Sequence, residues 1–189
     1  MTFLRQAFAA LRLLIVMTVL LGVLYPAVIT VIAQVGIKGQ ANGSLVTNAA
    51  GQVVGSALLG QKVDGPQWFQ PRPSASDYSG STSGGSNLSP ASKAQQDARA
   101  QREADLKAAN PDAVGPVPED ALTASASGLD AYISVAYAQW QVPRVAKARG
   151  MSAADLQSMI AAATDKALLG YIGQDGVNVT RLNAALANR

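Results

Sequence analysis

The stretch STSGGSNLSP, residues 81–90, combines serine, glycine and asparagine in a way that could present backbone amides to an anion. A nucleotide-binding loop of the G-x-x-x-x-G-K-[ST] type also needs a lysine that reaches the phosphates. No lysine follows Gly84 or Gly85 at that spacing. Because glycine and serine also gather before helices to form turns and caps, the spacing favours a structural loop over a phosphate site.

The residue types that the chain lacks narrow the possible chemistry further. With no histidine and no cysteine, the chain cannot form a Ser-His or Cys-His nucleophile pair, the usual zinc ligand sets or a disulfide bond. A membrane-anchored extracytoplasmic hydrolase with a Ser/Lys pair remains an alternative, since that nucleophile needs no histidine. The S-x-x-K motif of one such enzyme class does not occur in the sequence.

Charged residues offer two weaker possibilities. Asp77 and Asp130 lie among small residues and could bind a hard cation such as calcium or potassium, although capping a turn or helix is the commoner role. Arg144, Lys147 and Arg149 could present a basic helix face to an acidic partner, although a solvated face is the default interpretation.

The pI of 9.3 does not indicate a nucleic-acid partner. Two of the 15 basic residues, Arg5 and Arg12, precede a long apolar segment, and the rest nearly balance the 12 acidic residues. The sequence contains no basic run interleaved with aromatic residues. We therefore expect no nucleic acid among the partners.

The elements that must position these residues begin with an uncharged apolar segment from Leu13 to Ala33. As a helix it would span a hydrocarbon core of about 30 Å. A cleaved signal peptide is the alternative, but its apolar region is shorter, and no clear small-x-small cleavage site follows. Since Arg5 and Arg12 outnumber the single Lys38 beyond the segment, the positive-inside rule places the N-terminus in the cytoplasm. The prediction is a cytoplasmic stub over residues 1–12, a transmembrane helix over 13–35 and an extracytoplasmic domain over 36–189.

Within the apolar segment, Gly22, Tyr25 and Pro26 interrupt an aliphatic run. Glycine permits close approach of helices and proline bends a helix, and both features favour a helix that packs against other membrane segments. Such residues are also commoner in membrane helices in general. A single membrane helix without a catalytic set suggests a subunit of a complex rather than a stand-alone enzyme.

The outer part of the chain alternates strand-like and helical patterns irregularly, which predicts a small α+β domain. A β-hairpin is predicted around a turn at Asn48–Gly51. Residues 60–90 are rich in glycine, proline and serine but contain Trp68, Phe69 and Tyr78. We therefore expect an ordered loop that its aromatic side chains anchor in the core.

A helix is expected to follow this loop, from about Pro90 to Asn110, with Ser89 or Ser92 as its cap. Its apolar positions are mostly alanine, so we expect a surface helix with a thin buried stripe. A proline-rich connector, PDAVGPVPED, and an extended segment of small residues, TASASGLDAYIS, come next.

The C-terminal third predicts four further helical elements. A helix starts near Ser134, and Pro143 is expected to interrupt it and to begin a new helix. A capping box at residues 152–155 opens a helix that ends near Gly170, and residues 181–188 form the last helical turns. The tripeptides YIG and VNV are short candidate strands.

In their order along the chain, these residues resemble the C subunit of the bacterial Kdp potassium-transporting ATPase, a P-type ATPase complex. The motifs that carry the resemblance are G-x-x-YP in the membrane segment, ANGSLV (41–46), GSALLGQ (55–61), WFQPRPSA (68–75), SGGSNL (83–88), PVPED, TASASGLD (123–130), QVPRVAKARG (141–150) and VNV-x-x-LN (177–183). The sequence departs from the family where Ala131 and Tyr132 replace a common Pro-His and where Thr180 replaces an aliphatic residue.

The resemblance implies a non-catalytic, single-pass subunit in the bacterial inner membrane. Its partners would be a potassium-translocating A subunit, an ATP-hydrolysing B subunit, a small F subunit and membrane lipid. The family's C subunit is described as needed for assembly and as a catalytic chaperone that raises the B subunit's affinity for ATP. No tightly bound cofactor, catalytic residue or metal ligand is implied, and ATP would be shared transiently with the B subunit.

Two mechanisms follow from the resemblance. In the first, the outer domain caps the extracellular mouth of the ion-conducting subunit and the membrane helix clamps the complex. Its docking face would be formed by the loop from Trp68 to Leu88 and the segment from Thr123 to Asp130. The expected docking residues are Gly22, Tyr25, Pro26, Trp68, Phe69, Arg72, Pro73, Ser127, Gly128, Asp130 and Arg144. In the second, a nucleotide contacts Ser83, Gly84, Gly85, Ser86 and Asn87, while Arg144 or Lys147 neutralises phosphate charge. The predicted topology opposes the second mechanism, because ATP lies inside the cell and this loop outside.

Overall fold

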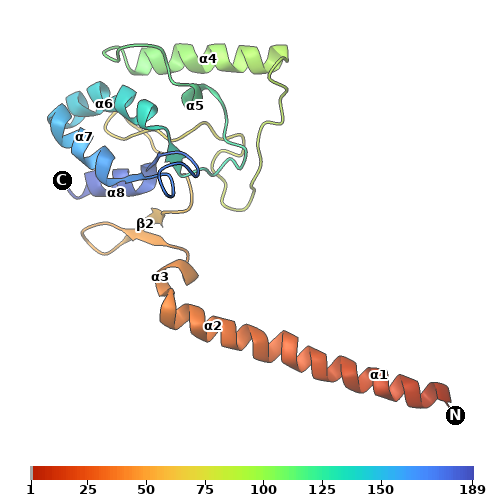
Figure 1. Ribbon diagram of the computed structural model, residues 1–189. Coiled ribbons are helices and arrows are strands. Elements are labelled where there is room, and N and C mark those ends of the chain that lie inside the picture. The colour runs from red at the N-terminus through yellow and green to blue at the C-terminus, as the bar shows by residue number, and fades with distance from the viewer. Residues whose placement is uncertain (1) are drawn as a thin grey trace. The chain divides into compact units, whose positions relative to one another are not determined.

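The computed structural model describes residues 2–189, which fall into two compact units, one ending at Ser44 and one covering Leu45–Arg189. In the first unit, α1 (Thr2–Val19), a π-helical turn (Leu20–Leu24) and α2 (Tyr25–Gly36) form one long helix, and the short α3 (Lys38–Ala41) follows (Figure 1). Among the described residues it is the one helix that is long and apolar enough to cross a membrane. The helix extends further toward the N-terminus than the predicted span of 13–35.

Pro26 explains the π-helical turn in this helix. Its ring nitrogen carries no hydrogen, so it cannot donate the usual bond to the carbonyl of Gly22, four residues back. Next to it, the N–H of Tyr25 bonds to the carbonyl of Leu20, five residues back, and not four residues back as in an α-helix. The helix therefore widens for one turn. Gly22, Tyr25 and Pro26 therefore lie together at one irregular point of the membrane helix.

The second unit opens with the predicted hairpin. Strands β1 (Leu45–Thr47) and β2 (Val53–Ser56) pair antiparallel. The side chain of Asn48 shapes the turn, because its Oδ1 accepts hydrogen bonds from Ala50 N at 3.1 Å and Gln52 N at 2.9 Å. The prediction of a turn at this asparagine is confirmed.

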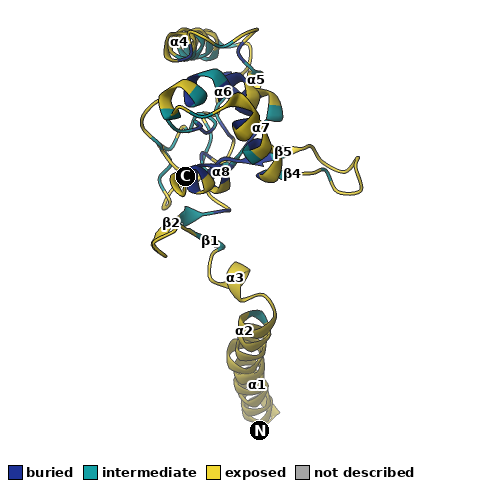
Figure 2. Cartoon of the chain, turned by 90° about the vertical axis from the view of Figure 1, so that its left-hand side faces the viewer, coloured by how far each residue is buried: buried dark blue, intermediate teal, exposed yellow. Residues whose placement is uncertain are grey.

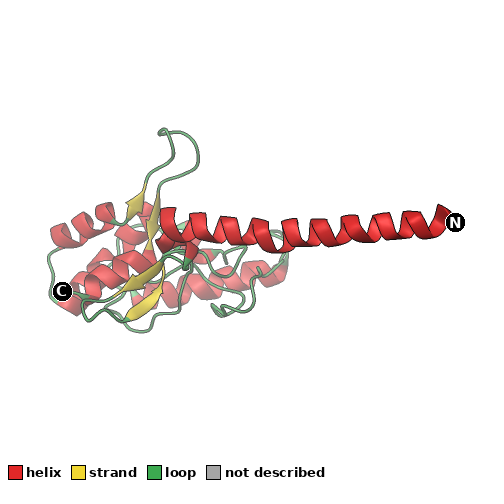
Figure 3. Ribbon diagram, turned by 90° about the horizontal axis from the view of Figure 1, so that it is seen from below, coloured by secondary structure: helices red, strands yellow, loops and turns green. Residues whose placement is uncertain are grey.

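A three-stranded antiparallel sheet joins the middle and the end of the chain (Figure 3). Strand β5 (Gly176–Asn178) lies between β3 (Tyr132–Ile133) and β4 (Thr164–Asp165). The predicted VNV strand is thus present, whereas YIG contributes only an isolated bridge through Ile172. Short strands with helices around them confirm the α+β class.

Side chains cap most of the helices in this unit. The helices are α4 (Lys93–Ala109), α5 (Glu119–Leu122), α6 (Val135–Arg149), α7 (Ala153–Ala162) and α8 (Val179–Ala187). Ser92 caps α4, Ser134 caps α6, Ser152 caps α7 and Asn178 caps α8, each by accepting a hydrogen bond from a backbone N–H three residues on. Helix α4 buries no residue fully, as the prediction of a surface helix required.

Two predicted helix boundaries are wrong. Helix α6 runs through Pro143 without a break, because the carbonyl that loses its donor belongs to Gln139, which is exposed and can bond to water. Helix α7 ends at Ala162 rather than near Gly170. The following residue pair, Thr164 and Asp165, joins β5 instead, so strand pairing replaces the helical bonds there.

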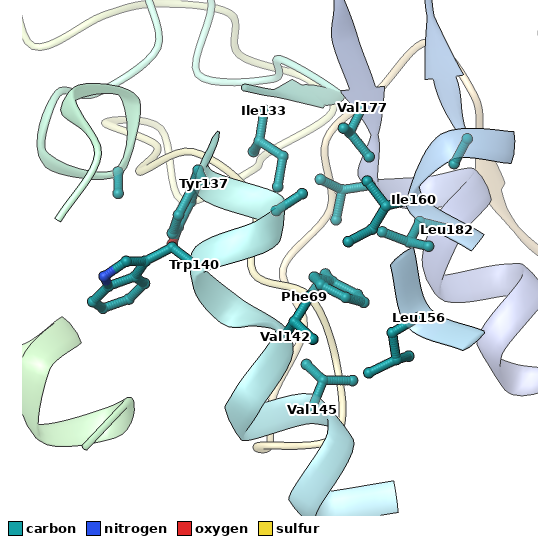
Figure 4. Packing of buried hydrophobic residues seen from close by; sticks show 14 of the residues in the cluster. Phe69, Ile133, Tyr137, Trp140, Val142, Val145, Leu156, Ile160, Val177 and Leu182 are labelled. Atoms are coloured by element: carbon teal, nitrogen blue, oxygen red, sulfur yellow. The ribbon is translucent and has the colours of Figure 1, made fainter. Parts of the chain in front are cut away.

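The hydrophobic core lies among α6, α7, α8 and β5 (Figure 2). Phe69 enters it from the loop after the hairpin and is fully buried among Val142, Leu156 and Leu182 (Figure 4). The prediction that aromatic residues anchor this loop is confirmed for Phe69. The core therefore fixes the start of the loop that carries the candidate site.

Candidate functional site

The two predicted docking segments lie side by side in the structure. We refer to residues 68–88 as the long loop and to residues 123–130 as the short loop. Hydrogen bonds to backbone carbonyls join them: Gly84 N to Ser127 O (2.8 Å), Ser83 Oγ to Ser127 O (3.1 Å), Ser74 Oγ to Gly128 O (2.7 Å) and Ser125 N to Pro73 O (2.9 Å). The loops therefore form one continuous surface from segments about fifty residues apart in the sequence.

Glycine is required where the loops touch. A Cβ added to Gly85 would lie 3.0 Å from the carbonyl oxygen of Ala126, closer than real Cβ atoms normally come. Gly128 has φ +69°, and a Cβ there would lie 2.8 Å from Gly84 O and would also meet Ser76 Oγ. Ser83, Gly84 and Gly85 thus serve the contact between the loops, which explains the two adjacent glycines of the stretch.

An ion pair closes the other end of the surface. Arg72 donates to Asp130 Oδ2 at 3.1 Å and to the carbonyl of Thr123 at 3.4 Å, so one guanidinium links the long loop to both ends of the short loop. The Oδ1 atom of Asp130 accepts the N–H of Tyr132 at 3.0 Å. Both charged side chains are about 30% exposed, so the pair is partly shielded from water.

Tyr78 holds the long loop from within. Its hydroxyl donates to the carbonyl of Arg72 at 2.7 Å, and Tyr78 itself has φ +57°. Burial, and secondly the negative charge of Asp77, raise the pKa of Tyr78 to about 12. The hydroxyl therefore stays protonated and able to donate at neutral pH.

Buried amides that the sequence reasoning missed hold the start of the long loop. Asn183 Oδ1 accepts the N–H of Phe69 at 3.0 Å and its Nδ2 donates to the carbonyl of Phe69 at 2.8 Å. Gln141 makes the same pair of bonds with Gln70, at 2.7 and 3.2 Å. The sequence signal was a polar residue inside an apolar helical run, as in Trp140-Gln141-Val142.

Arg144 lies inside the domain rather than on a basic face. Its side chain is almost fully buried and donates to Asn110 Oδ1, Gln141 Oε1 and the carbonyls of Pro66 and Trp68. Burial lowers the pKa of its guanidinium from the ordinary value. Arg144 therefore positions the long loop and does not itself face a partner.

The other basic residues of α6 are also engaged within the chain. Lys147 pairs with Asp112 at 2.9 Å. Arg149 stacks over the ring of Trp68 at 4.4 Å and donates to the carbonyls of Gln67 and Leu186. The cations that a nucleotide site at SGGSN would need thus already have partners.

The SGGSN stretch itself is exposed or half-buried. The N–H of Gly84 is used by Ser127, and α4 begins only at Lys93, so no helix N-terminus directly follows the stretch. Ser86 and Asn87 are exposed, and Asn87 has φ +53°. This geometry presents the stretch outward as a shaped loop.

Neither the Ser/Lys hydrolase nor the cation site at Asp77 or Asp130 gains support from the geometry. Every lysine between residues 45 and 189 lies in an ion pair with a carboxylate, so its amino group contacts an acidic side chain and not a serine hydroxyl. Asp77 pairs with Lys62 at 3.0 Å and Asp130 with Arg72, so a cationic side chain occupies each carboxylate. Within the described residues, no group of three or more acidic side chains is arranged for a metal ion.

Comparisons with known proteins show the family of the chain. The family model for K+-transporting ATPase, c chain (KdpC), matches residues 7–188. The chain is 47% identical over 185 residues to the potassium-transporting ATPase KdpC subunit of Geobacter sulfurreducens, with 94% of each chain covered. It is 49% identical over 180 residues to that of Sorangium cellulosum, with 94% of each covered, and 48% identical over 188 residues to that of Herpetosiphon aurantiacus, with 98% and 95% covered. The chain therefore belongs to the KdpC family, the C subunits of the potassium-transporting ATPase.

Proposed function

We propose that the outer domain docks on the extracytoplasmic side of the potassium-translocating A subunit through the surface formed by the long and short loops. The observation that carries this proposal is the joining of the two loops into one exposed surface of small residues, held by Phe69 and by the Arg72–Asp130 pair. Small residues let a partner's backbone approach closely, and a prearranged surface loses little entropy on binding.

The membrane helix supplies the second contact in this proposal. A Cβ at Gly22 would meet only Thr18 Cγ2, at an ordinary 3.9 Å, so the chain itself does not require glycine there. A small residue beside the widened turn at Tyr25 and Pro26 lets another membrane helix approach closely. With the N-terminus in the cytoplasm of a bacterial cell, as Arg5 and Arg12 favour, the helix clamps the complex within the inner membrane.

The effect on ATP affinity is then indirect. In this account, the C subunit stabilises the assembled complex of A, B and F subunits, and the B subunit binds ATP more tightly because its conformation is coupled to that assembly. Arg144 is buried and bonded within the domain and Lys147 pairs with Asp112 at its surface, which supports an indirect effect over contact between ATP and Ser83–Asn87. A photoreactive ATP analogue should accordingly label the B subunit of the intact complex and not this chain; labelling of residues 83–87 would favour direct contact.

Bulky substitutions on the loops test the docking surface. We expect Gly85→Trp and Ser86→Trp to release the chain from the co-purified complex. Ser86 is exposed, so Ser86→Trp adds bulk without the contact that Gly85→Trp makes with Ala126. Gln157→Trp, at an exposed position on α7, is the matched control and should leave co-purification unchanged. Full retention of the Ser86→Trp variant would count strongly against the proposal.

A further inference from the structure

The connection between β4 and β5 extends away from the body of the outer domain as a narrow hairpin (Figures 2 and 3). We call residues 166–175 the finger. Leu168 and Ile172 exchange two backbone hydrogen bonds of 2.9 Å near its tip. At its base, Asp175 accepts the N–H of Ala167 at 2.9 Å and pairs with Lys166 at 2.7 Å. The finger is therefore a defined structure and not a slack loop.

The tip of the finger exposes large apolar side chains. Leu168, Leu169, Tyr171 and Ile172 are 66%, 73%, 77% and 49% exposed, and none belongs to the core cluster. Between Lys166 and Asp175 the finger carries no charged residue. Single exposed apolar residues are normal, but four on one tip are typical of a surface that another molecule covers.

The backbone at the tip points to the same conclusion. Leu169 has φ +56°, a region that leucine rarely adopts and that glycine adopts freely, and Gly170 follows with φ +81°. Because the side chain of Leu169 is mostly in water, it gains no packing energy within the domain to offset this backbone strain. A leucine at this position is explained by what it contacts outside the chain.

We infer that the finger inserts into an apolar, uncharged pocket on the extracytoplasmic face of a membrane-embedded subunit of the same complex. This inference rests on the proposed function, since it takes the outer domain to dock on a partner subunit. Charge favours a protein pocket over an anionic lipid surface. Lys166, the one basic residue of the finger, pairs with Asp175 at its base, and Arg181 of α8 pairs with Asp165 of β4, so the finger presents no unpaired base to lipid phosphates.

A crosslinker at the tip identifies what covers it. The full chain, with a benzophenone side chain in place of Tyr171, is expressed with its partner subunits and irradiated in membranes. We expect a crosslink to a membrane-embedded partner subunit. Crosslinks only to lipid, only to a second copy of this chain, or no stronger than those from the same probe at the exposed Val114 would overturn the inference.

Two substitutions separate docking from folding. Leu169→Gly removes the side chain and also relieves the positive φ, so the urea midpoint of the variant should equal or exceed that of the parent chain. Leu169→Gly and Tyr171→Ser should each raise the rate at which the chain leaves the purified complex at least about tenfold, because each removes a large apolar contact. Val114→Ser is the control, since Val114 is 90% exposed on the proline-rich connector.

The tests of the finger and of the loop surface can fail separately. If Ser86→Trp releases the chain while Leu169→Gly and Tyr171→Ser dissociate at the parent rate, the inference about the finger is wrong and the proposed function stands. If the Tyr171 crosslink forms on a membrane-embedded subunit while Ser86→Trp is fully retained, the finger docks and the loop surface does not.

Discussion

Replacing Asn183 with leucine should detach the start of the long loop from the core. The side-chain amide of Asn183 satisfies both the N–H and the carbonyl of Phe69, at 3.0 and 2.8 Å. Leucine has the same number of side-chain heavy atoms but can make neither bond. Because Phe69 is 0% exposed, both of its backbone groups would be left buried without a partner.

The magnitude follows from those two groups. Each buried backbone group that loses its partner costs about 1–3 kcal/mol. Asn183 also lines an apolar groove of about 260 Å³, through which water can reach part of the gap. For the two groups together the cost could be about 2–6 kcal/mol. We therefore expect the free energy of unfolding to fall by about 3 kcal/mol, in the lower half of that range.

Urea unfolding of the full-length chain in detergent micelles measures this change. The chain has two tryptophans, and Trp68 directly precedes Phe69, so its fluorescence reports on the loop. With a urea dependence of about 2 kcal/mol per molar, the midpoint should fall by about 1.5 M. Asn188→Leu is the matched control: Asn188 bonds to the exposed N–H of Ala49, and its replacement should cost under about 1 kcal/mol because water takes its place.

A small loss of stability in Asn183→Leu would contradict the role assigned to this side chain. If Asn183→Leu lowers the free energy of unfolding by no more than Asn188→Leu does, the backbone groups of Phe69 find other partners. The anchoring of the long loop by a buried amide would then be wrong, and the rigidity of the docking surface would need another explanation.

Two further predictions concern the loop surface. Gly128→Ala should destabilise the chain by about 2 kcal/mol or more, because of the positive φ and the contact with Gly84 O. Gly115→Ala is the control and should cost only about 1 kcal/mol, since Gly115 has φ +89° but open space around its Cβ. Equal urea midpoints for the two variants would disprove the contact. Because the pKa of Tyr78 is raised to about 12, chiefly by burial, its neutral form adds stability that is complete below the unfolded pKa near 10 and is lost as the pH rises toward 12. Tyr78→Phe should therefore flatten the fall of the urea midpoint over this range, and an unchanged slope would contradict the assignment.

Local patterns in the sequence predicted the elements that local bonds form. The turn at Asn48 and the caps Ser92 and Ser152 depend on side chains that bond within three or four residues, so spacing alone reveals them. The long N-terminal helix follows in the same way from an uncharged apolar run.

Features that depend on long-range contacts could not be predicted from local sequence patterns. Asn183 and Phe69 are separated by 114 positions, and nothing local marks the asparagine as the partner of a loop. Helix α7 stops early because β4 pairs with β5, a tertiary contact that overrides helix propensity. The finger was missed for the related reason that YIG has the composition of a buried strand, while the structure leaves Tyr171 and Ile172 in solvent.

In the proposed complex, the loop surface lies outside the membrane and is covered by a partner subunit. Because the chain has no cysteine, Ser86→Cys gives a single reactive thiol at an exposed position of SGGSN. Labelling with a membrane-impermeant thiol reagent in intact cells is compared with and without the partner subunits. We expect the reagent to label the chain expressed alone and the assembled complex to protect it. Labelling only after lysis, or equal labelling with and without the partners, would contradict it.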